Sequence, residues 1–197
     1  MIRTFVAVEL DRDLRTVLGR VQAEVRERCV RGGGQDVRVQ WVKPDSIHLT
    51  LKFLGAIEEA RIQDIRTALG PVVVGQPRFS VEVGGLGVFP DLRAPRVIWI
   101  GLSGRVDELV RLAADVDRAL HIIGFPLESR PWSPHLTLAR VKERSREAGK
   151  GFAATGALNG FTSVGSLSIS VASLMQSELK PSGAVYSQLL ALPLKEV

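Results

Sequence analysis

The sequence is poor in the residues from which metal sites and covalent cross-links are built. Its 197 residues include one cysteine, Cys29, and three histidines, His48, His121 and His135. A single cysteine excludes an intramolecular disulfide and a thiolate zinc cluster, because each needs more than one sulfur. The histidines are scattered and have no carboxylate motif close by. We therefore expect no metal ion and no other cofactor.

Long apolar runs are also missing. No stretch approaches the roughly 20 apolar residues that span a bilayer as a helix. Residues 1–10 have the pattern of an alternating strand, interrupted by Arg3 and Glu9, and not that of a signal peptide. These absences predict no membrane partner and a cytoplasmic location.

The overall composition is that of a globular protein with a moderate excess of positive charge. Hydrophobic residues make up 45% and charged residues 24%, and no linker rich in Pro, Gly or Ser interrupts the chain. We therefore expect residues 1–197 to form a single domain. The net charge is +5 and the sequence pI is near 9.9, which favours a polyanionic partner such as nucleic acid.

The tetrapeptide His-Leu-Thr-Leu occurs twice, at residues 48–51 and 135–138. Its alternation predicts two β-strands, in which residues i and i+2 project from the same face. His48 would then lie beside Thr50, and His135 beside Thr137, with the leucines buried on the opposite face. A lone histidine in a strand is usually structural, as we expect of His121, but the duplication favours a function.

An imidazole beside a hydroxyl is suited to phosphate chemistry. Imidazole has a pKa near 6.5 and gives or takes a proton at neutral pH, and a threonine hydroxyl donates a hydrogen bond to an anionic oxygen. Two such pairs facing each other across a cleft would supply a general base on one side of a phosphate and a general acid on the other. The motifs predict an in-line phosphoryl-transfer site without metal.

Strands and helices are expected in both halves of the chain. Strands are predicted at 2–9, 37–42, 79–83, 96–100, within 163–175, at 184–191 and around both motifs, and helices at 11–29, 58–69 and 105–121. Segment 84–95 is expected to be turn-rich, and segment 142–151 a solvated loop whose Lys142, Arg144, Arg146 and Lys150 could touch an RNA backbone. The motifs lie 87 residues apart, which suggests a pseudo-two-fold arrangement with the site at the junction.

Longer segments accompany the motifs: RTFVAVEL, HLTLKFLG, GLGVFP with PRVIWIGL, SPHLTLAR and SLMQSELKPSGAVYSQLLALPL. Over nearly its whole length the sequence resembles the 2H phosphoesterase superfamily, and within it the bacterial and archaeal RNA 2′,3′-cyclic phosphodiesterases, also called 2′-5′ RNA ligases. The resemblance implies a bilobal, LigT-like α+β fold. In this fold two antiparallel sheets with outer helices, related by a pseudo-two-fold, face each other across a central cleft.

The same resemblance implies an activity and its residues. It implies metal-independent hydrolysis of RNA 2′,3′-cyclic phosphate ends, such as those of tRNA halves, to 2′-phosphates, with reversible 2′-5′ ligation, by a monomer without an obligate protein partner. His48 would be the general acid and His135 the general base. Thr50, Thr137 and Arg140 would bind the phosphate, although Arg140 would lie off the face of His135 in a regular strand.

Other readings and residues stay open from the sequence. The same chemistry could act on a small cyclic phosphate of the ADP-ribose type or on 2′-5′ linked oligonucleotides, and the cleft could belong to a non-catalytic binder of RNA ends. By strand parity Phe53 is expected in the core, on the face of Leu49. Tyr186 and Trp132 are candidates for contact with a base.

Overall fold

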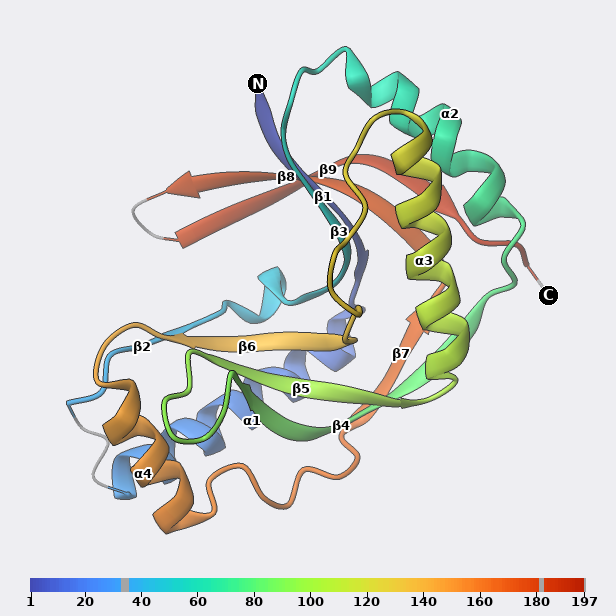
Figure 1. The fold of residues 1–197 in the computed structure, drawn as a ribbon. Helices are drawn as coiled ribbons and strands as arrows, with labels where there is room; N and C mark the ends of the chain where they lie inside the picture. The colour runs from blue at the N-terminus through green and yellow to red at the C-terminus, as the bar shows by residue number, and fades with distance from the viewer. Residues whose placement is uncertain (33–35, 181–182, 197) are drawn as a thin grey trace.

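An antiparallel sheet that curls through the molecule carries both motifs (Figure 1). The computed structural model describes residues 1–32, 36–180 and 183–196. Within these residues the sheet has nine strands, in the order β7-β4-β5-β6-β3-β1-β8-β9, with β2 paired to β6. The α+β class and the antiparallel pairing expected from the sequence are confirmed.

The strands form two groups that meet between the motifs. The first group consists of β3 (His48–Ile57), β1 (Ile2–Glu9), β8 (Val171–Lys180) and β9 (Gly183–Pro193). The second consists of β6 (His135–Val141), β5 (Val97–Gly104), β4 (Phe79–Phe89), β7 (Gly165–Ile169) and β2 (Val39–Trp41). One antiparallel residue pair, Leu49 with Leu136, joins β3 to β6. The two expected sheets are thus continuous at this pair, and each group takes strands from both halves of the chain.

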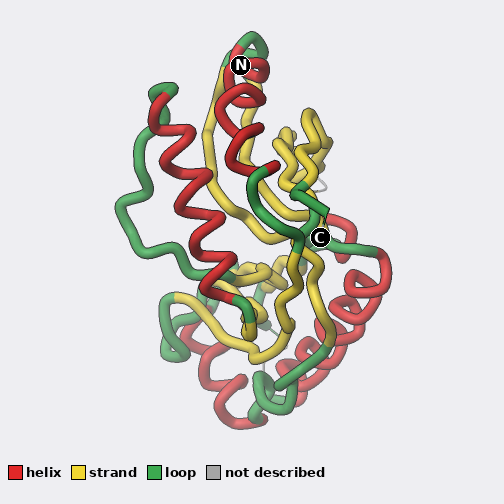
Figure 2. The backbone as a smooth tube through the Cα atoms, turned by 90° about the vertical axis from the view of Figure 1, so that its right-hand side faces the viewer, coloured by secondary structure: helices red, strands yellow, loops and turns green. Residues whose placement is uncertain are grey.

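The helices lie on the outside, with the strands between them (Figure 2). Helices α2 (Arg61–Val74) and α3 (Val106–Ile122) pack together beside the first group, and α1 (Arg12–Arg31) and α4 (Ser145–Thr155) beside the second. A short 3-10 helix, η1 (Pro44–Ser46), precedes β3. Apolar side chains of α1, α2 and α3 share a core cluster with the inner faces of the strands. Because this core buries the leucines of each motif strand, it fixes which face of the strand lies outside the core.

The longest predicted elements are confirmed, and two segments differ. The strand at 2–9 matches β1, and the helices at 11–29 and 105–121 match α1 and α3 within two residues. The segment 84–95 was expected to be turn-rich, but β4 continues to Phe89. Gly84 permits this because a Cβ there would lie 2.1 Å from the carbonyl oxygen of Thr162. The strand therefore continues through glycines that resemble turn signals in the sequence.

The predicted solvated loop at 142–151 is wrong, because most of it lies in α4. Ala148, Gly149, Gly151 and Phe152 are buried at helical spacing. The small residues bring backbones together: a Cβ on Gly149 would lie 1.9 Å from the carbonyl oxygen of Leu92. The apolar face of this helix is narrow and most residues of the segment are polar. Over so short a stretch the hydrophobic periodicity does not reveal a helix.

Candidate active site

The two motifs open β6 and the long strand β3, and their leucines fix their orientation. Leu49, Leu51, Leu136 and Leu138 are buried in the core as expected. Their burial leaves His48 and Thr50, and likewise His135 and Thr137, half-buried on the opposite face. Because the antiparallel pair Leu49–Leu136 joins equivalent residues, the motifs are related locally by two-fold symmetry.

Both motif strands contain a β-bulge directly after the threonine. In the pairing of β1 with β3 the register skips Leu51, and in the pairing of β5 with β6 it skips Leu138. Each bulge turns two consecutive side chains into the core, Leu51 with Lys52 and Leu138 with Ala139. The parity of the residues that follow is therefore reversed, in β3 as far as a second register shift that skips Leu54.

The reversal changes the position of the residue five places after each histidine. Phe53 was expected in the core, but this is wrong: its side chain is 63% exposed and lines the cleft with His48. Arg140 was expected off the face of His135 in a regular strand, and the bulge returns it to that face, where it also lines the cleft. The bulges thus place a phenylalanine and an arginine at equivalent positions.

Each histidine is held through the same ring nitrogen. The Nδ1 atom of His48 lies 2.9 Å from the carbonyl oxygen of Ser46, and that of His135 lies 2.8 Å from the carbonyl oxygen of Ser133. A carbonyl only accepts, so the proton of the neutral imidazole resides on Nδ1 and Nε2 is left to exchange a proton. The two serines extend the repeat to Ser-x-His-Leu-Thr-Leu, a signal that the tetrapeptide alone misses.

Two aromatic rings pack against each imidazole. The ring centroid of His48 lies 4.6 Å from that of Phe5 and 5.0 Å from that of Tyr186. The centroid of His135 lies 5.1 Å from that of Phe89 and 6.4 Å from that of Trp99. Phe5 and Trp99 come from strands paired with the motif strands, and Phe89 from β4, one strand further away. Sequence reasoning gave these three rings no role in the site and so missed them.

Burial affects the electrostatics of His48. Desolvation beside Phe5 and Tyr186 lowers its pKa below the ordinary 6.5, although the hydrogen bond to Ser46 and the nearby Glu9 carboxylate act in the opposite direction. The pKa of Tyr186 is raised by the same kind of desolvation. Neutral imidazole is thus the favoured form of His48 near pH 7.

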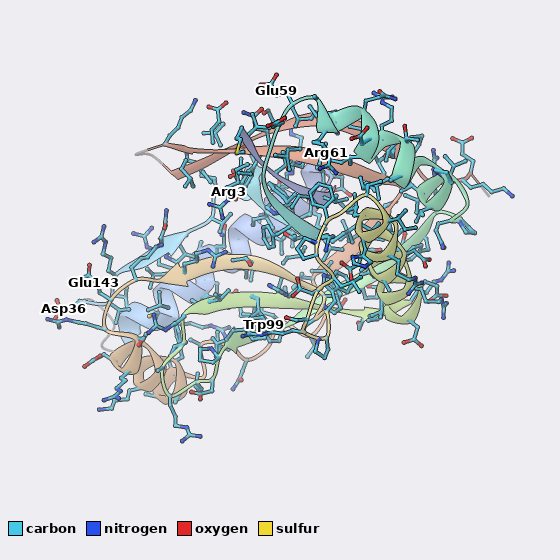
Figure 3. The ribbon with its side chains drawn as sticks, turned by 45° about the horizontal axis from the view of Figure 1, so that its top comes forward. Arg3, Asp36, Glu59, Arg61, Trp99 and Glu143 are labelled. Atoms are coloured by element: carbon cyan, nitrogen blue, oxygen red, sulfur yellow. The ribbon has the colours of Figure 1, made fainter. Side chains whose placement is uncertain are left out.

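The motifs line one cleft with a cavity volume of about 660 Å³. All five predicted site residues, His48, Thr50, His135, Thr137 and Arg140, line it, as do the aromatic residues Phe5, Trp41, Phe53 and Tyr186. Its other basic residues are Arg3, Lys43, Lys142 and Lys180, and no Asp or Glu occurs among the described residues that line it. Figure 3 shows Arg3 on the first strand group and Trp99 on the second.

Trp132, and His121, which was expected to be structural, lie outside the cleft lining. Trp132, a candidate for base contact, packs partly into the core, and its Nε1 donates to the backbone carbonyl of Thr50 at 3.1 Å. His121 lies at the end of α3, where its Nδ1 is 3.0 Å from the carbonyl oxygen of Phe125. Across residues 1–32, 36–180 and 183–196, His, Cys, Asp and Glu side chains form no group of three placed to hold a metal ion.

Comparison with known proteins identifies the class to which this cleft belongs. The profile of the family described as LigT like Phosphoesterase matches residues 8–99 and 100–186, two consecutive segments that each contain one motif. The chain belongs to this family.

Relatives of similar length support the assignment. The chain is 34% identical over 189 residues to the RNA 2′,3′-cyclic phosphodiesterase of Methanothermobacter thermautotrophicus, covering 95% of this chain and 96% of the relative. It is 34% identical over 182 residues to the protein of the same name from Aeropyrum pernix, covering 88% and 94%. The solved structure of TT0787 from Thermus thermophilus superposes with a TM-score of 0.77 at 28% identity, covering 99% of both chains.

Proposed function

We propose that this protein is a metal-independent RNA 2′,3′-cyclic phosphodiesterase that opens the cyclic phosphate to a 2′-phosphate. The observation that carries the proposal is the convergence of two His–Thr pairs on one cleft, each histidine held through Nδ1 and free at Nε2. The names of the relatives agree with it. The reaction needs only an acid, a base and stabilisation of phosphate charge, which these side chains supply.

Phe53 and Arg140, the cleft residues that follow the two bulges, suggest how the substrate is oriented. The terminal base is proposed to stack on the exposed ring of Phe53, because any of the four bases can stack on an aromatic ring. Arg140 at the equivalent position would bind a non-bridging phosphate oxygen beside His135. The ribose, and with it the departing 3′-oxygen, then lies on the side of His48.

This orientation assigns the histidines. Nε2 of His135 takes a proton from water as the water oxygen attacks phosphorus opposite the 3′-oxygen. The P–O3′ bond breaks, and Nε2 of His48 donates a proton to the departing oxygen from the protonated imidazole, which the lowered pKa makes the minor form near pH 7. Thr50 and Thr137 donate hydrogen bonds to the non-bridging oxygens as charge grows on them. The products are a 3′-hydroxyl and a 2′-phosphate. His135 then releases the proton that it took, and His48 regains one from solvent.

With an RNA 5′-hydroxyl in place of water, the same steps join RNA ends. The 5′-oxygen would attack the phosphorus of a cyclic end, the P–O3′ bond would break, and a 2′-5′ linkage with a free 3′-hydroxyl would form. We propose this reversible 2′-5′ ligation for the same two histidines. RNA ends such as those of tRNA halves are proposed substrates. We also propose that the chain forms a single cytoplasmic domain of two pseudo-symmetric lobes and works as a monomer. A cleft built from one chain supports this.

The first experiment follows the terminal phosphate in the presence of EDTA. An RNA ending in a 2′,3′-cyclic phosphate is incubated with the wild type, His48→Ala and His135→Ala. Conversion to a 2′-phosphate by the wild type, reduced about 10²- to 10⁴-fold in each variant, is expected for general acid–base catalysis. Binding of the RNA without conversion by the wild type would instead support the non-catalytic binder.

A sulfur-substituted substrate separates acid from base. When sulfur replaces the 3′-oxygen, the leaving group is a good one without protonation, so an acid is no longer needed. The 3′-thio substrate should restore most of the rate of His48→Ala and little of the rate of His135→Ala. The reverse pattern would exchange the two roles and leave the hydrolase assignment intact.

A further inference from the structure

The cleft carries more positive charge than a cyclic phosphate needs. A 2′,3′-cyclic phosphate bears one negative charge, for which Arg140 and the hydroxyls of the motifs suffice. Four further cations, Arg3, Lys43, Lys142 and Lys180, line the same cavity. No Asp or Glu occurs among the described residues that form its walls. Such an excess indicates a ligand with more than one anionic group.

The cations differ in how freely they can bind a ligand. Lys180 lies 3.4 Å from Glu178, which partly neutralises it. Arg3 lies on β1 near Tyr186, and its charge acts on that hydroxyl. Lys43 and Lys142 are exposed and form no ion pair with any residue that the structure describes. These two lysines are therefore the cations most available to a phosphate.

Both lysines lie on the wall made by β2 and β6, in line with Arg140. Arg140 and Lys142 share one face of the end of β6, with buried Val141 between them, so their backbones are roughly 6–7 Å apart. That distance is close to the spacing of neighbouring phosphates in an extended strand. Gln40 on β2 lies directly opposite Arg140, and Lys43 follows two residues after β2. The pairing continues to Val42 with Leu138 in one direction and to Arg38 with Lys142 in the other. Lys43 therefore lies towards Thr137, and Lys142, next to the Gln40–Arg140 pair, lies one phosphate beyond Arg140.

We propose that Lys142, with the amide of Gln40, forms a second phosphate subsite that binds the internal phosphodiester next to the cyclic end. This inference rests on the proposed function and narrows it: the preferred substrate is an oligonucleotide and not a mononucleotide. Neighbouring acids leave the subsite positive. Glu143, the nearest in sequence, is paired with Arg38 at 2.8 Å, and Asp36 lies 3.4 Å from Arg144. Figure 3 shows Glu143 and Asp36 at the outer edge of this strand group.

The test compares three substrates with the same reacting end. They are adenosine 2′,3′-cyclic phosphate, an adenosine trinucleotide with that end and 2′-O-methyl internal riboses, and the same trinucleotide with neutral methylphosphonate links. The wild type should have its highest kcat/KM on the charged trinucleotide. The neutral trinucleotide should behave like the mononucleotide, because only the internal charge is missing.

The variant Lys142→Met tests the subsite. Its loss in kcat/KM should be at least fivefold larger on the charged trinucleotide than on either the neutral trinucleotide or the mononucleotide. The slope of log kcat/KM against log salt should become shallower by about 0.7, the contribution of one phosphate contact to a single strand. Lys150→Met, which removes an exposed charge of α4 outside the cleft lining, is the matched control and should behave as the wild type.

Two results would overturn the subsite. One is an equal loss on all three substrates, and the other is an unchanged rate and salt slope on the charged trinucleotide. Either would leave hydrolysis of the mononucleotide, and so the proposed function, standing. A wild type that cleaves none of the three substrates would instead contradict the proposed function itself.

Discussion

At the scale of single residues, the exposed ring of Phe53 separates a binding role from a structural one. Because 63% of the side chain is exposed, Phe53→Leu should change the free energy of unfolding by less than about 0.5 kcal/mol. Base stacking is worth about 1–3 kcal/mol, so KM for RNA should rise roughly 5-fold or more. Denaturant unfolding and steady-state kinetics measure the two effects. Phe152→Leu, at a buried ring outside the cleft, should lower stability by about 1 kcal/mol and leave KM unchanged.

The lowered pKa of His48 makes a prediction about pH. Between the unfolded value near 6.5 and the lower folded value, the unfolded chain binds more of this proton, so stability falls as pH drops through that window. The His48 resonance in an NMR titration should give a pKa below 6.5. Tyr186→Ala, which admits water beside the imidazole, should raise it towards 6.5. A pKa above 6.5 in the wild type would show that the Ser46 and Glu9 contributions outweigh burial.

At the scale of elements, the strand faces of the repeated motif were predicted from the sequence, but the β-bulge that follows each motif threonine was not. Alternation predicted the faces of His48, Thr50, His135 and Thr137, because a strand period of two is read directly from the order of residues. The bulges after Thr50 and Thr137 are set by pairing with β1 and β5, and no local residue type marks them. The side of the strand on which Phe53 lies, beyond the first bulge, was therefore predicted incorrectly.

Distant buried polar groups stabilise these irregular positions. Gln22 of α1 donates from Nε2 to the carbonyl of the bulged Leu138 at 2.8 Å and to that of Val42 at 2.7 Å. At the other bulge Lys52, 6% exposed, donates to Asp117 of α3 and to the carbonyl of Pro126 at 2.7 Å. A helical Gln and a strand Lys look like solvated residues in a sequence. Their burial follows only from tertiary contacts between segments distant in the chain, such as Lys52 and Asp117, which are 65 residues apart.

At the scale of the whole molecule, the distance between the motifs depends on few contacts. Where the two strand groups meet, β3 and β6 share the single backbone pair Leu49–Leu136. The connection from α3 to His135, residues 123–134, runs beside β3 and is attached to it twice. Pro126 accepts from Lys52, and Trp132 donates to the carbonyl of Thr50. This connection therefore ties one motif to the strand that carries the other.

Neither the two-lobed arrangement nor the charge of the cleft could be read in full from composition. The net charge of +5 correctly indicated a surface suited to polyanions, but it did not distinguish Lys142, which lines the cleft, from Arg146 and Lys150, which do not. The helices and strands of each group come from both halves of the chain, so the position of a charge along the sequence does not give its side of the molecule.

The hydrogen bond from Trp132 to the carbonyl of Thr50 predicts a kinetic effect that a general loss of stability would not produce. Trp132→Phe keeps the ring in the core and removes the hydrogen bond to Thr50, which is worth about 1 kcal/mol and so about 2–4 °C in Tm. Because that bond fixes Thr50 relative to the segment entering His135, kcat should fall about three- to tenfold while KM changes little, as expected if these two residues of the proposed active site are misplaced. Ile65→Val, fully buried in α2, should cost about 0.5–1.5 kcal/mol and leave kcat intact. Equal kcat in Trp132→Phe and Ile65→Val would show that the single pair Leu49–Leu136 and the core suffice to set the spacing of the histidines.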